Sequence, residues 1–237
     1  MKRNFLAIIP ARGGSKGIPK KNIVNLCGKP LIGWSIDVAL KTKDISRVIV
    51  STDDEEIATI AKEHGAEVPF IRPKKLAEDH TPTIDVLRHA IGWLNENERM
   101  LYDAIVLLEP TSPIRSHEDI SKAIKLFLDK QADSVVSVIE IEKHYNPEWQ
   151  FLIKKDNMLS CFVNKNISDI ASRRQELRST YIRNGAVYVI KTDNIFGDSS
   201  GLYGKKVYAY VMNKESSIDI NTPDDLLKAE LIMKKNR

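Results

Sequence analysis

Short runs of apolar, mostly β-branched residues alternate with amphipathic segments along the N-terminal half of this chain. The apolar runs lie at residues 5–9, 48–50, 104–108 and 134–141. Between them, segments such as 30–39 and 83–94 repeat apolar side chains at helical spacing. This alternation is typical of strand–helix units on a parallel sheet. It predicts an α/β fold built on a doubly wound, mostly parallel sheet.

Length and charge balance restrict the class of protein further. The 237 residues suit a single domain over 1–237 that can bury a substantial core. Lys and Arg number 36 against 32 Asp and Glu, so the net charge of +4 comes from nearly equal numbers of both signs. Such a surface lacks the concentrated basic field of a nucleic-acid binder. We therefore expect no nucleic-acid partner and only a local anion site.

The remaining composition favours a cytoplasmic protein that has no membrane partner. The apolar run at 5–9 ends at Pro10 and precedes Arg12, so it is too short for a signal-peptide core or a membrane span. Cys27 and Cys161 form neither a Cys-x-x-Cys pair nor a pattern with histidine at metal-ligand spacing. We predict neither a disulfide framework nor a zinc site.

The regular alternation breaks near residue 142. Aromatic and amide residues such as Tyr145, Asn146 and Trp149 replace the periodic pattern, and short strand-like pieces surround polar loops. We predict an excursion from the sheet over about 142–205. A helix from Thr222 to about Lys235 is expected to close the fold.

A loop rich in glycine and lysine directly follows the first predicted strand. Gly13, Gly14 and Gly17 allow several backbone N–H groups to point into one concavity. Its cations are Arg12, Lys16, Lys20 and Lys21. Ligands of open α/β sheets lie outside the carboxyl ends of the strands, where loops 51–54 and 109–115 also belong. The pattern predicts a polyphosphate site at that edge, the alternative being a flexible basic surface loop.

Two familiar phosphate loops are excluded by spacing. Ile18 stands where a Walker A loop needs its second glycine. Ser15 replaces the second glycine of the dinucleotide-binding fingerprint. The loop therefore belongs to neither type.

Several further blocks follow this loop in order, from about residue 8 to 226. The blocks are Pro10-Ala11-Arg12-Gly13-Gly14-Ser15-Lys16-Gly17, Lys21-Asn22, Leu31-Ile32-Gly33-Trp34-Ser35-Ile36, Ser51-Thr52-Asp53, Arg72-Pro73, Leu76-Ala77-Glu78-Asp79, Leu107-Leu108-Glu109-Pro110-Thr111-Ser112-Pro113-Ile114-Arg115, Arg173-Arg174-Gln175, Asn184-Gly185-Ala186-Val187-Tyr188 and Ser217-Ile218-Asp219-Ile220-Asn221. Together they resemble the sugar-activating nucleotidyltransferases, most closely the CMP-sialic acid (N-acylneuraminate) cytidylyltransferases. The resemblance implies the Rossmann-like fold of nucleotide-diphospho-sugar transferases. It also implies transfer of CMP from CTP to the anomeric hydroxyl of a nine-carbon 2-keto acid, with release of pyrophosphate.

For the nucleotide, the resemblance implies that CTP is held mainly by the glycine-rich loop. The loop residues expected to bind it are Ala11, Arg12, Gly13, Ser15, Lys16 and Asn22. Lys21 is expected to stabilise charge on the reacting α-phosphate, and we predict Lys21, Arg12 and Asp219 as the catalytic residues. Arg72 and Thr83 match positions that contact the nucleotide in relatives, although a helix N-cap explains Thr83 equally well.

For the sugar, the resemblance points to Glu109, Arg174 and Tyr188. Relatives often carry Gln where this chain has Glu109, and a carboxylate accepts hydrogen bonds but donates none unless it is protonated. We infer that Glu109 recognises a hydroxyl or an acylamino N–H, the alternative being a structural partner at the strand end. Arg174 is expected to bind the sugar carboxylate by bidentate pairing. Tyr188 either lines the sugar pocket or packs in the core.

For the metal, the resemblance implies Mg²⁺ bound by a pair of aspartates, of which this chain keeps one. Asp219 and Asn221 lie two apart, so both point to one face of an extended segment. The amide brings no charge, and we expect Asp219 to be the principal ligand, with water or phosphate oxygens filling the other positions. Capping of the helix after Thr222 is the alternative for Asn221. The sequence shows no histidine array and does not identify a general base.

We therefore predict a CMP-nonulosonate synthetase that binds CTP and an acidic nine-carbon sugar. Glu109 and Asn221 favour legionaminic or pseudaminic acid over plain sialic acid. The excursion resembles the family's dimerisation arm, so a homodimer is expected. The alternatives are a 3-deoxy-octulosonate or hexose-1-phosphate nucleotidyltransferase, and a non-catalytic nucleotide-binding regulator.

Overall fold

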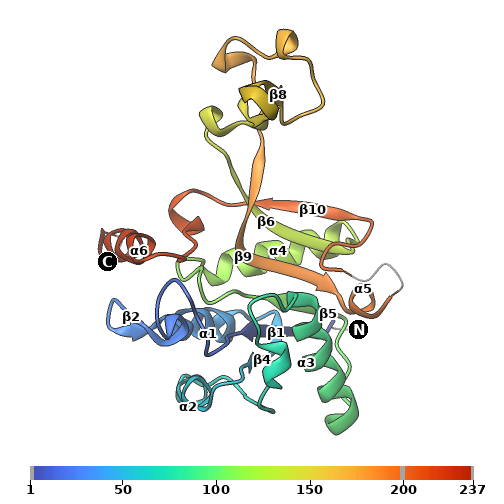
Figure 1. Cartoon of the computed structure of the whole chain (residues 1–237). Coiled ribbons are helices and arrows are strands. Elements are labelled where there is room, and N and C mark those ends of the chain that lie inside the picture. The colour runs from blue at the N-terminus through green and yellow to red at the C-terminus, as the bar shows by residue number, and fades with distance from the viewer. Residues whose placement is uncertain (1–2, 198–200, 236–237) are drawn as a thin grey trace.

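A computed structural model describes residues 3–197 and 201–235, and its centre is a six-stranded sheet (Figure 1). The strands stand in the order β10-β6-β9-β5-β1-β4. Their bounds are β1 (Phe5–Pro10), β4 (Ile45–Ser51), β5 (Ala104–Leu107), β6 (Ser134–Glu140), β9 (Tyr181–Lys191) and β10 (Val207–Val211). β1 runs parallel to β4 and β5, and β10 runs parallel to β6. The predicted α/β fold with a mostly parallel sheet is confirmed, with β9 as an antiparallel strand between β5 and β6.

Helices cover both faces of this sheet. The helices are α1 (Leu31–Lys41), α2 (Glu55–Glu63), α3 (Thr83–Glu98), α4 (His117–Asp129), α5 (Thr192–Phe196) and α6 (Pro223–Lys235). Side chains of α1, α2 and α4 share one buried cluster with Ala7 and Ile9, whereas those of α3 and α5 share another with Leu6 and Ile8. Alternate residues of β1 thus supply opposite faces, as the period of a strand requires. Apolar side chains on both faces explain why these strands read as continuous apolar runs.

Side-chain caps start two helices just beyond strand ends. The Asp54 carboxylate accepts hydrogen bonds from the backbone N–H groups of Glu56 and Ile57 at 2.8 and 3.1 Å, and so begins α2 after β4. Ser116 and Asp119 form a reciprocal capping box that begins α4. These caps orient the loops at the carboxyl ends of β4 and β5.

The segment after α2 differs from the sequence expectation. The sequence at 68–71 is compatible with a short strand, but among the described residues this region forms single bridges, Ile49 to Glu67 and Thr52 to Ile71. The 3-10 turn η2 (Lys74–Leu76) follows. The backbone N–H of Arg72 donates to the Thr52 carbonyl at 2.7 Å, which brings this segment to the carboxyl end of β4.

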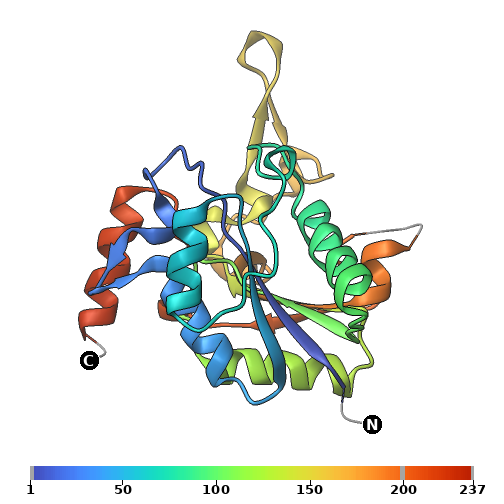
Figure 2. The same cartoon turned by 90° about the horizontal axis from the view of Figure 1, so that it is seen from below.

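Residues 142–180 form an arm that projects beyond the body of the molecule in both views (Figures 1 and 2). Its hairpin joins β7 (Phe151–Ile153) to β8 (Leu159–Cys161). Its 3-10 turns are η3 (Lys143–Tyr145), η4 (Pro147–Trp149), η5 (Lys155–Asn157), η6 (Ile167–Asp169) and η7 (Arg174–Glu176). The predicted excursion over 142–205 is therefore too long, because β9 returns into the central sheet at Tyr181. The antiparallel course of β9 carries the chain back from the arm without a crossover helix.

Smaller elements complete the surface beside the glycine-rich loop. The turn η1 (Lys21–Ile23) leads into a hairpin of β2 (Asn25–Leu26) and β3 (Lys29–Pro30). Ile18 and Leu26 pack with Ile220 and Ala229, so α6 and the turn η8 (Glu215–Ser217) before it are held against this region. In the described part of the chain, no helix is long and apolar enough to cross a membrane.

Candidate active site

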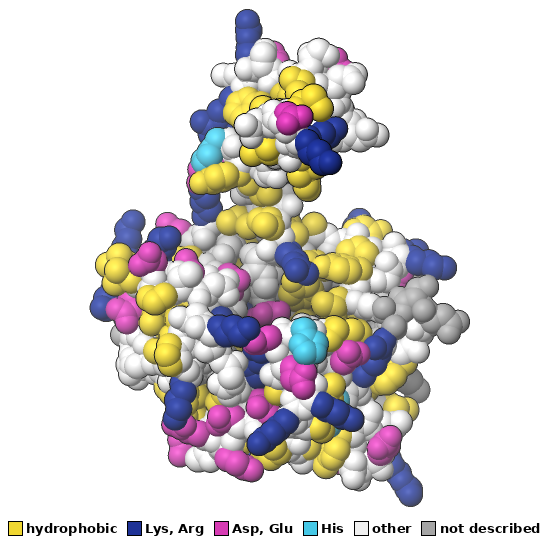
Figure 3. All heavy atoms as spheres, viewed as in Figure 1, with side chains coloured by type: hydrophobic (Ala, Val, Ile, Leu, Met, Phe, Trp, Pro, Cys, Tyr) yellow, Lys and Arg dark blue, Asp and Glu magenta, His cyan; other side chains and the backbone are white. Residues whose placement is uncertain are grey.

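A cavity of about 240 Å³ lies at the carboxyl edge of β1, β4 and β5. It is lined by Pro10, Arg12, Lys21, Asn22, Arg72, Leu76, Ala77, Glu78, Asp79, Thr81, Thr83, Val86, Glu109, Pro110 and Thr111. Two of the three strand-end loops singled out in the sequence, 11–22 and 109–115, contribute to this lining. Figure 3 shows basic, acidic and histidine side chains gathering on the surface below the base of the arm. The edge predicted to bind a ligand is therefore hollowed and charged.

Hydrogen bonds to neighbouring segments hold the glycine-rich loop. Ala11 is buried, and its N–H donates to the Ser51 carbonyl at 3.0 Å. The Asn22 side chain donates to the Arg12 carbonyl at 2.9 Å, and the Gly13 N–H donates to the Asp53 carboxylate at 3.1 Å. The backbone of the loop is thereby fixed against β4 without using its cationic side chains.

Two glycines of the loop are needed because other chain segments approach closely. A Cβ atom on Gly13 would lie 2.6 Å from Asp54 Oδ2, and one on Gly17 would lie 2.3 Å from the Asn221 carbonyl oxygen. Gly14 differs, since no described heavy atom lies within 4 Å of its Cβ position. Gly17 thus permits the contact between the loop and the segment that carries Asp219.

The four cations of the loop do not act together. Arg12 and Lys16 both pair with Asp79, at 2.6 and 2.5 Å. Lys20 pairs with Glu56 of α2 at 2.5 Å, outside the cavity. Lys21 lines the cavity. Repulsion among the cations is thus reduced by acids from separate elements, which the sequence pattern did not reveal.

Lys21 meets the predicted metal-binding segment. Its Nζ donates to the Ile220 carbonyl at 3.0 Å and to Asn221 Oδ1 at 3.3 Å. The Asn221 amide in turn donates to Asp219 Oδ2 at 2.7 Å. Burial lowers the pKa of Lys21 below its usual value, although the Asp219 and Glu109 carboxylates oppose this. Asn221 therefore connects a carboxylate to a cation across 200 residues of sequence.

Asp219 and Asn221 offer the hard oxygen ligands that Mg²⁺ prefers. Among the described residues, however, no group of three or more His, Cys, Asp or Glu side chains converges as a complete metal site. The capping alternative for Asn221 is not supported by its side chain. Thr222 instead receives the Asp225 N–H at 3.3 Å at the start of α6. The pair fits a metal only if other oxygen ligands complete its coordination.

Arg72 and Thr83 line the opposite wall of the cavity. Arg72 is only 3% exposed and lies 3.6 Å from Asp53. Burial lowers its pKa below the usual value for arginine, and no described atom accepts a hydrogen bond from its Nε. The N-cap of α3 is Pro82, and no side-chain cap is formed, so the capping alternative for Thr83 is wrong. Thr83 lines the cavity, and within the described part of the chain its hydroxyl makes no hydrogen bond.

Glu109 lies half-buried in the floor of the cavity. Burial, and then the nearby Asp219 carboxylate, raises the pKa of Glu109. The fully buried Arg115 donates to the Glu109 carbonyl and to the Ala186 carbonyl, each at 2.7 Å, and also to Ser35 Oγ. Arg115 thus ties the end of β5 to β9 and α1, a role that sequence reasoning missed although the residue stands in a quoted block.

Tyr188 lies on β9 opposite Leu107, and only 4% of it is exposed. It packs in the core, yet burial and then the Glu109 charge raise the pKa of its phenol to about 12. Arg183, on the same strand, donates to the Tyr203 hydroxyl at 3.2 Å, and its charge lowers the pKa of Glu109. Arg183 is a cation near Glu109 that sequence reasoning did not single out.

Arg174 lies apart from this cavity. It lines a second cavity of about 400 Å³ at the base of the arm, together with Glu142, Lys143 and Lys214. Within one chain, therefore, the structure does not bring Arg174 to Glu109 or Tyr188. Among the other predicted residues, Arg12, Lys21, Asn22, Arg72, Thr83 and Glu109 line the main cavity. Ala11, Gly13, Ser15 and Lys16 belong to its loop, and Asp219 and Asn221 reach it through Lys21.

Comparison with known proteins agrees with this architecture. The solved structure of CMP:2-keto-3-deoxy-manno-octonic acid synthetase complexed with CTP superposes with a TM-score of 0.74 and 18% identity, covering 99% of this chain and all of the other. A 4-diphosphocytidyl-2C-methyl-D-erythritol synthase from Anaerococcus prevotii gives a TM-score of 0.66 at 15% identity, covering 99% and 100% of the two chains. At these identities the likeness concerns the fold.

Sequence comparison is more specific. The chain is 33% identical over 231 residues to a pseudaminic acid cytidylyltransferase from Campylobacter jejuni, covering 98% of this chain and 97% of the relative. It is 34% identical over 237 residues to a CMP-N,N'-diacetyllegionaminic acid synthase from Legionella pneumophila, again covering 98% and 97%. An N-acylneuraminate cytidylyltransferase from Streptococcus agalactiae is 34% identical over 224 residues, covering 94% of this chain and 51% of the relative. A family model described as cytidylyltransferase matches residues 6–229. The chain therefore belongs to the cytidylyltransferase family, and the family predicted from its sequence blocks is confirmed.

Proposed function

We propose that this protein transfers CMP from CTP to the anomeric C2 hydroxyl of a nonulosonic acid and releases pyrophosphate. The observation that carries the proposal is the cavity itself, which gathers Arg12, Lys21 and Arg72 near the carboxylates of Glu109 and Asp219. Both substrates are anionic, so the cations offset repulsion that would otherwise keep them apart. Relatives named for sialic, pseudaminic and legionaminic acids support this class of sugar.

In the proposed reaction, the sugar's C2 oxygen forms a bond to the α-phosphorus, and the bond from that phosphorus to the β-phosphate oxygen breaks. Arg12 and Lys16 neutralise phosphate oxygens at the loop, and Lys21 stabilises charge that grows on the α-phosphate. Arg72 and Thr83 bind the nucleotide at the opposite wall. The C2 hydroxyl proton passes to a general base as the new bond forms.

Glu109 is proposed to face the sugar, whereas Tyr188 is buried in the core and is coupled to the site through the charge of Glu109. The raised pKa of Glu109 increases its protonated fraction, and in that form the carboxyl group donates as well as accepts a hydrogen bond. Recognition of an acylamino or hydroxyl group by Glu109 favours legionaminic or pseudaminic acid. Arg183, whose charge acts on Glu109, is proposed as a further cation for the acidic sugar.

Arg174 is proposed to reach the sugar carboxylate of a neighbouring copy through a homodimer. The arm that carries it exposes many large apolar side chains, which is a property of interaction surfaces. They include Tyr145, Phe151, Leu152, Ile153, Met158, Leu159, Phe162 and Ile167. Pairing of the arms of two copies would cover these side chains. It would also bring Arg174 of one copy toward the active site of the other.

Mg²⁺ is proposed as the cofactor, held by Asp219 and Asn221 together with nucleotide oxygens and water. When bound, it would neutralise phosphate charge and orient the triphosphate. Such a biosynthetic reaction uses CTP, so a cytoplasmic location is inferred.

Pyrophosphate release tests the proposal. The enzyme is assayed with magnesium and either CTP or GTP, against N-acetylneuraminic, diacetyllegionaminic and pseudaminic acids and glucosamine 1-phosphate. Turnover with CTP and a nonulosonic acid is expected. Turnover only with GTP and the sugar phosphate would contradict it, and tight CTP binding without turnover would indicate a regulator. Arg174→Ala should cripple the keto-acid reaction and spare a sugar-phosphate reaction.

A further inference from the structure

Asp79 bridges the two cations of the glycine-rich loop that are proposed to bind phosphate. Its Oδ1 lies 2.6 Å from Arg12, and its Oδ2 lies 2.5 Å from Lys16. The carboxylate belongs to the segment after η2, on the far wall of the cavity. One acid thus closes the cavity by joining two walls that are separated by more than sixty residues of sequence.

The two ion pairs engage the N–H donors of Arg12 and Lys16, which a bound phosphate would also need. Each carboxylate oxygen takes one cation, as two oxygens of a phosphate group would. The Lys16 and Arg12 hydrogen bonds hold the pKa of Asp79 below its usual value, so the group remains charged at neutral pH. A polyphosphate cannot take both cations fully while Asp79 holds them, and its own charge would repel the carboxylate.

We propose that Asp79 serves as a stand-in anion, which neutralises Arg12 and Lys16 in the empty enzyme and is exchanged for the triphosphate of the nucleotide. Asp79 thereby lowers the affinity for nucleotide and favours ligands with several phosphates, which displace it completely. The inference rests on the proposed function for the identity of the nucleotide. The exchange itself rests only on the contacts of Asp79 with Arg12 and Lys16.

Exposure makes the exchange feasible. The side chains of Asp79, Arg12 and Lys16 are 44%, 34% and 82% exposed. Exposed ion pairs of this kind contribute little stability, so a polyphosphate with several charges can replace them. The neighbouring Glu78 supplies a control for local charge: it lines the same cavity, but in the described structure it pairs with His80 at 3.1 Å and with neither Arg12 nor Lys16.

The test is calorimetric titration of the full chain with tripolyphosphate, CTP, GTP and CMP, for wild type, Asp79→Asn and Glu78→Gln. Both variants remove one negative charge from the same segment. Asp79→Asn should bind tripolyphosphate and CTP about fivefold more tightly, which corresponds to two exposed ion pairs, and CMP with a smaller gain. Glu78→Gln should change each affinity by less than about twofold. Thermal unfolding of each variant checks that the fold is retained.

Two outcomes would overturn the exchange. Weaker CTP binding by Asp79→Asn would mean that Asp79 positions the loop for the nucleotide and does not compete with it. Equal gains in Asp79→Asn and Glu78→Gln would mean that only the net charge matters. Failure of the proposed function looks different: wild type would then bind tripolyphosphate but show no preference for CTP over GTP, while the difference between the two variants persisted.

Discussion

At the scale of single residues, the fold changes the ionisation of the side chains that face the cavity. Burial lowers the pKa of Lys21 and raises that of Glu109. Each shift reduces the charge of a group that lacks full hydration, while Asp219 acts on both groups. Shifted pKa values of this kind are typical of functional sites.

Glu109→Gln should stabilise the protein at neutral pH. The folded state holds the Glu109 proton more tightly than the unfolded state, whose pKa is near 4.5. Wild-type stability therefore falls as pH rises from 4.5 through the raised pKa, and an amide removes this loss. Urea unfolding from pH 4 to 8 should show a difference between variant and wild type that grows with pH.

Glu118→Gln provides the control for Glu109→Gln because the pKa of Glu118 is lowered, mainly by a backbone hydrogen bond at the start of α4. The same measurement should then show a small loss of stability above pH 4.5, opposite in sign. A parallel response of both variants would refute the assigned environment of Glu109.

Gly17→Ala should loosen the contact between the glycine-rich loop and the segment of Asp219. The added methyl group would lie 2.3 Å from the Asn221 carbonyl oxygen, a backbone atom that cannot turn away. We expect a loss of about 1–3 kcal/mol in the free energy of unfolding together with weaker CTP binding. Gly14→Ala is the matched control, since its Cβ meets no described atom within 4 Å. Similar losses in both variants would show that loop flexibility, and not this contact, is responsible.

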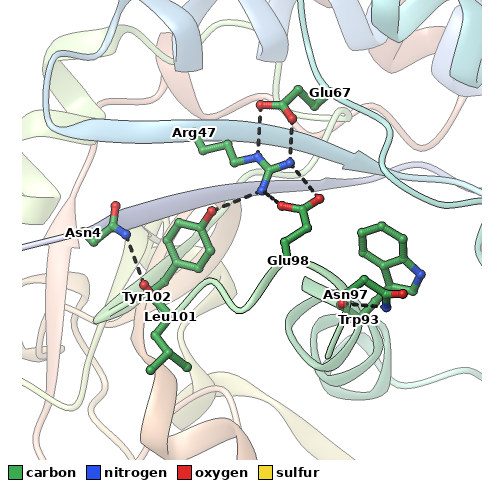
Figure 4. A network of polar contacts seen from close by, with 8 residues as sticks. All are labelled: Asn4, Arg47, Glu67, Trp93, Asn97, Glu98, Leu101 and Tyr102. Atoms are coloured by element: carbon green, nitrogen blue, oxygen red, sulfur yellow. Dashed lines mark hydrogen bonds and ion pairs between the residues drawn. The ribbon is translucent and has the colours of Figure 1, made fainter. Parts of the chain in front are cut away.

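At the scale of elements, a polar network around Arg47 holds together several segments that position the cavity. Arg47 of β4 donates to Glu67 through Nε and Nη2 at 3.0 and 2.6 Å, and through Nη1 to Glu98 at 2.5 Å (Figure 4). Glu98 ends α3, and Tyr102, which precedes β5, lies 3.4 Å from the same guanidinium. The hydrogen bonds to both carboxylates raise the pKa of Arg47. One side chain thus joins β4, α3 and the segment that leads to Arg72.

Arg47→Met should destabilise the fold by about 2 kcal/mol, because two carboxylates lose their charged donor while the side-chain volume is kept. The measurement is chemical unfolding at pH 7. Lys125→Met is the control, since it removes an exposed i,i+4 pair with Asp129 and should cost no more than about 0.5 kcal/mol. Comparable effects of the two substitutions would mean that the network adds nothing beyond an ordinary surface pair.

At the scale of the whole molecule, the arm stands clear of the body (Figures 1 and 2). Its hairpin exposes apolar side chains. Phe151, Leu152 and Ile153 are all exposed, and their strand, β7, forms a two-stranded sheet with β8. A two-stranded hairpin is marginally stable alone. Pairing of arms from two copies would bury this surface.

Ile153→Glu should therefore convert the expected dimer into monomers. Ile153 is 75% exposed, so the substitution places a charge in the proposed interface without disturbing the core of the chain. Light scattering at micromolar concentration should give twice 26.8 kDa for wild type and 26.8 kDa for the variant. Leu101→Glu is the control, because Leu101 is 74% exposed on the body of the molecule and should leave the dimer intact. A monomeric wild type would remove the basis for placing Arg174 in a partner's site.

Patterns of neighbouring residues in the sequence were sufficient to predict the features that depend on local spacing. The spacing of apolar residues predicted the main strands and helices and the α/β class, because the buried face of a helix or strand is set by spacing along the chain. The glycine-rich loop predicted a ligand site at one edge of the sheet, because its glycines and cations are close together in sequence, and the structure has a charged cavity at that edge. The order of blocks then led to the cytidylyltransferase family.

Contacts between distant segments depended on folding. The return of β9 into the sheet, the pairing of Asp79 with Arg12 and Lys16, and the link from Lys21 to Asn221 each join residues far apart in sequence. Burial also separated side chains that look equivalent, such as the exposed Lys20 and the shielded Lys21. Such pairings follow from the packing of all elements at once, because a side chain's partners and its distance from water are properties of the assembled chain and of no single stretch within it.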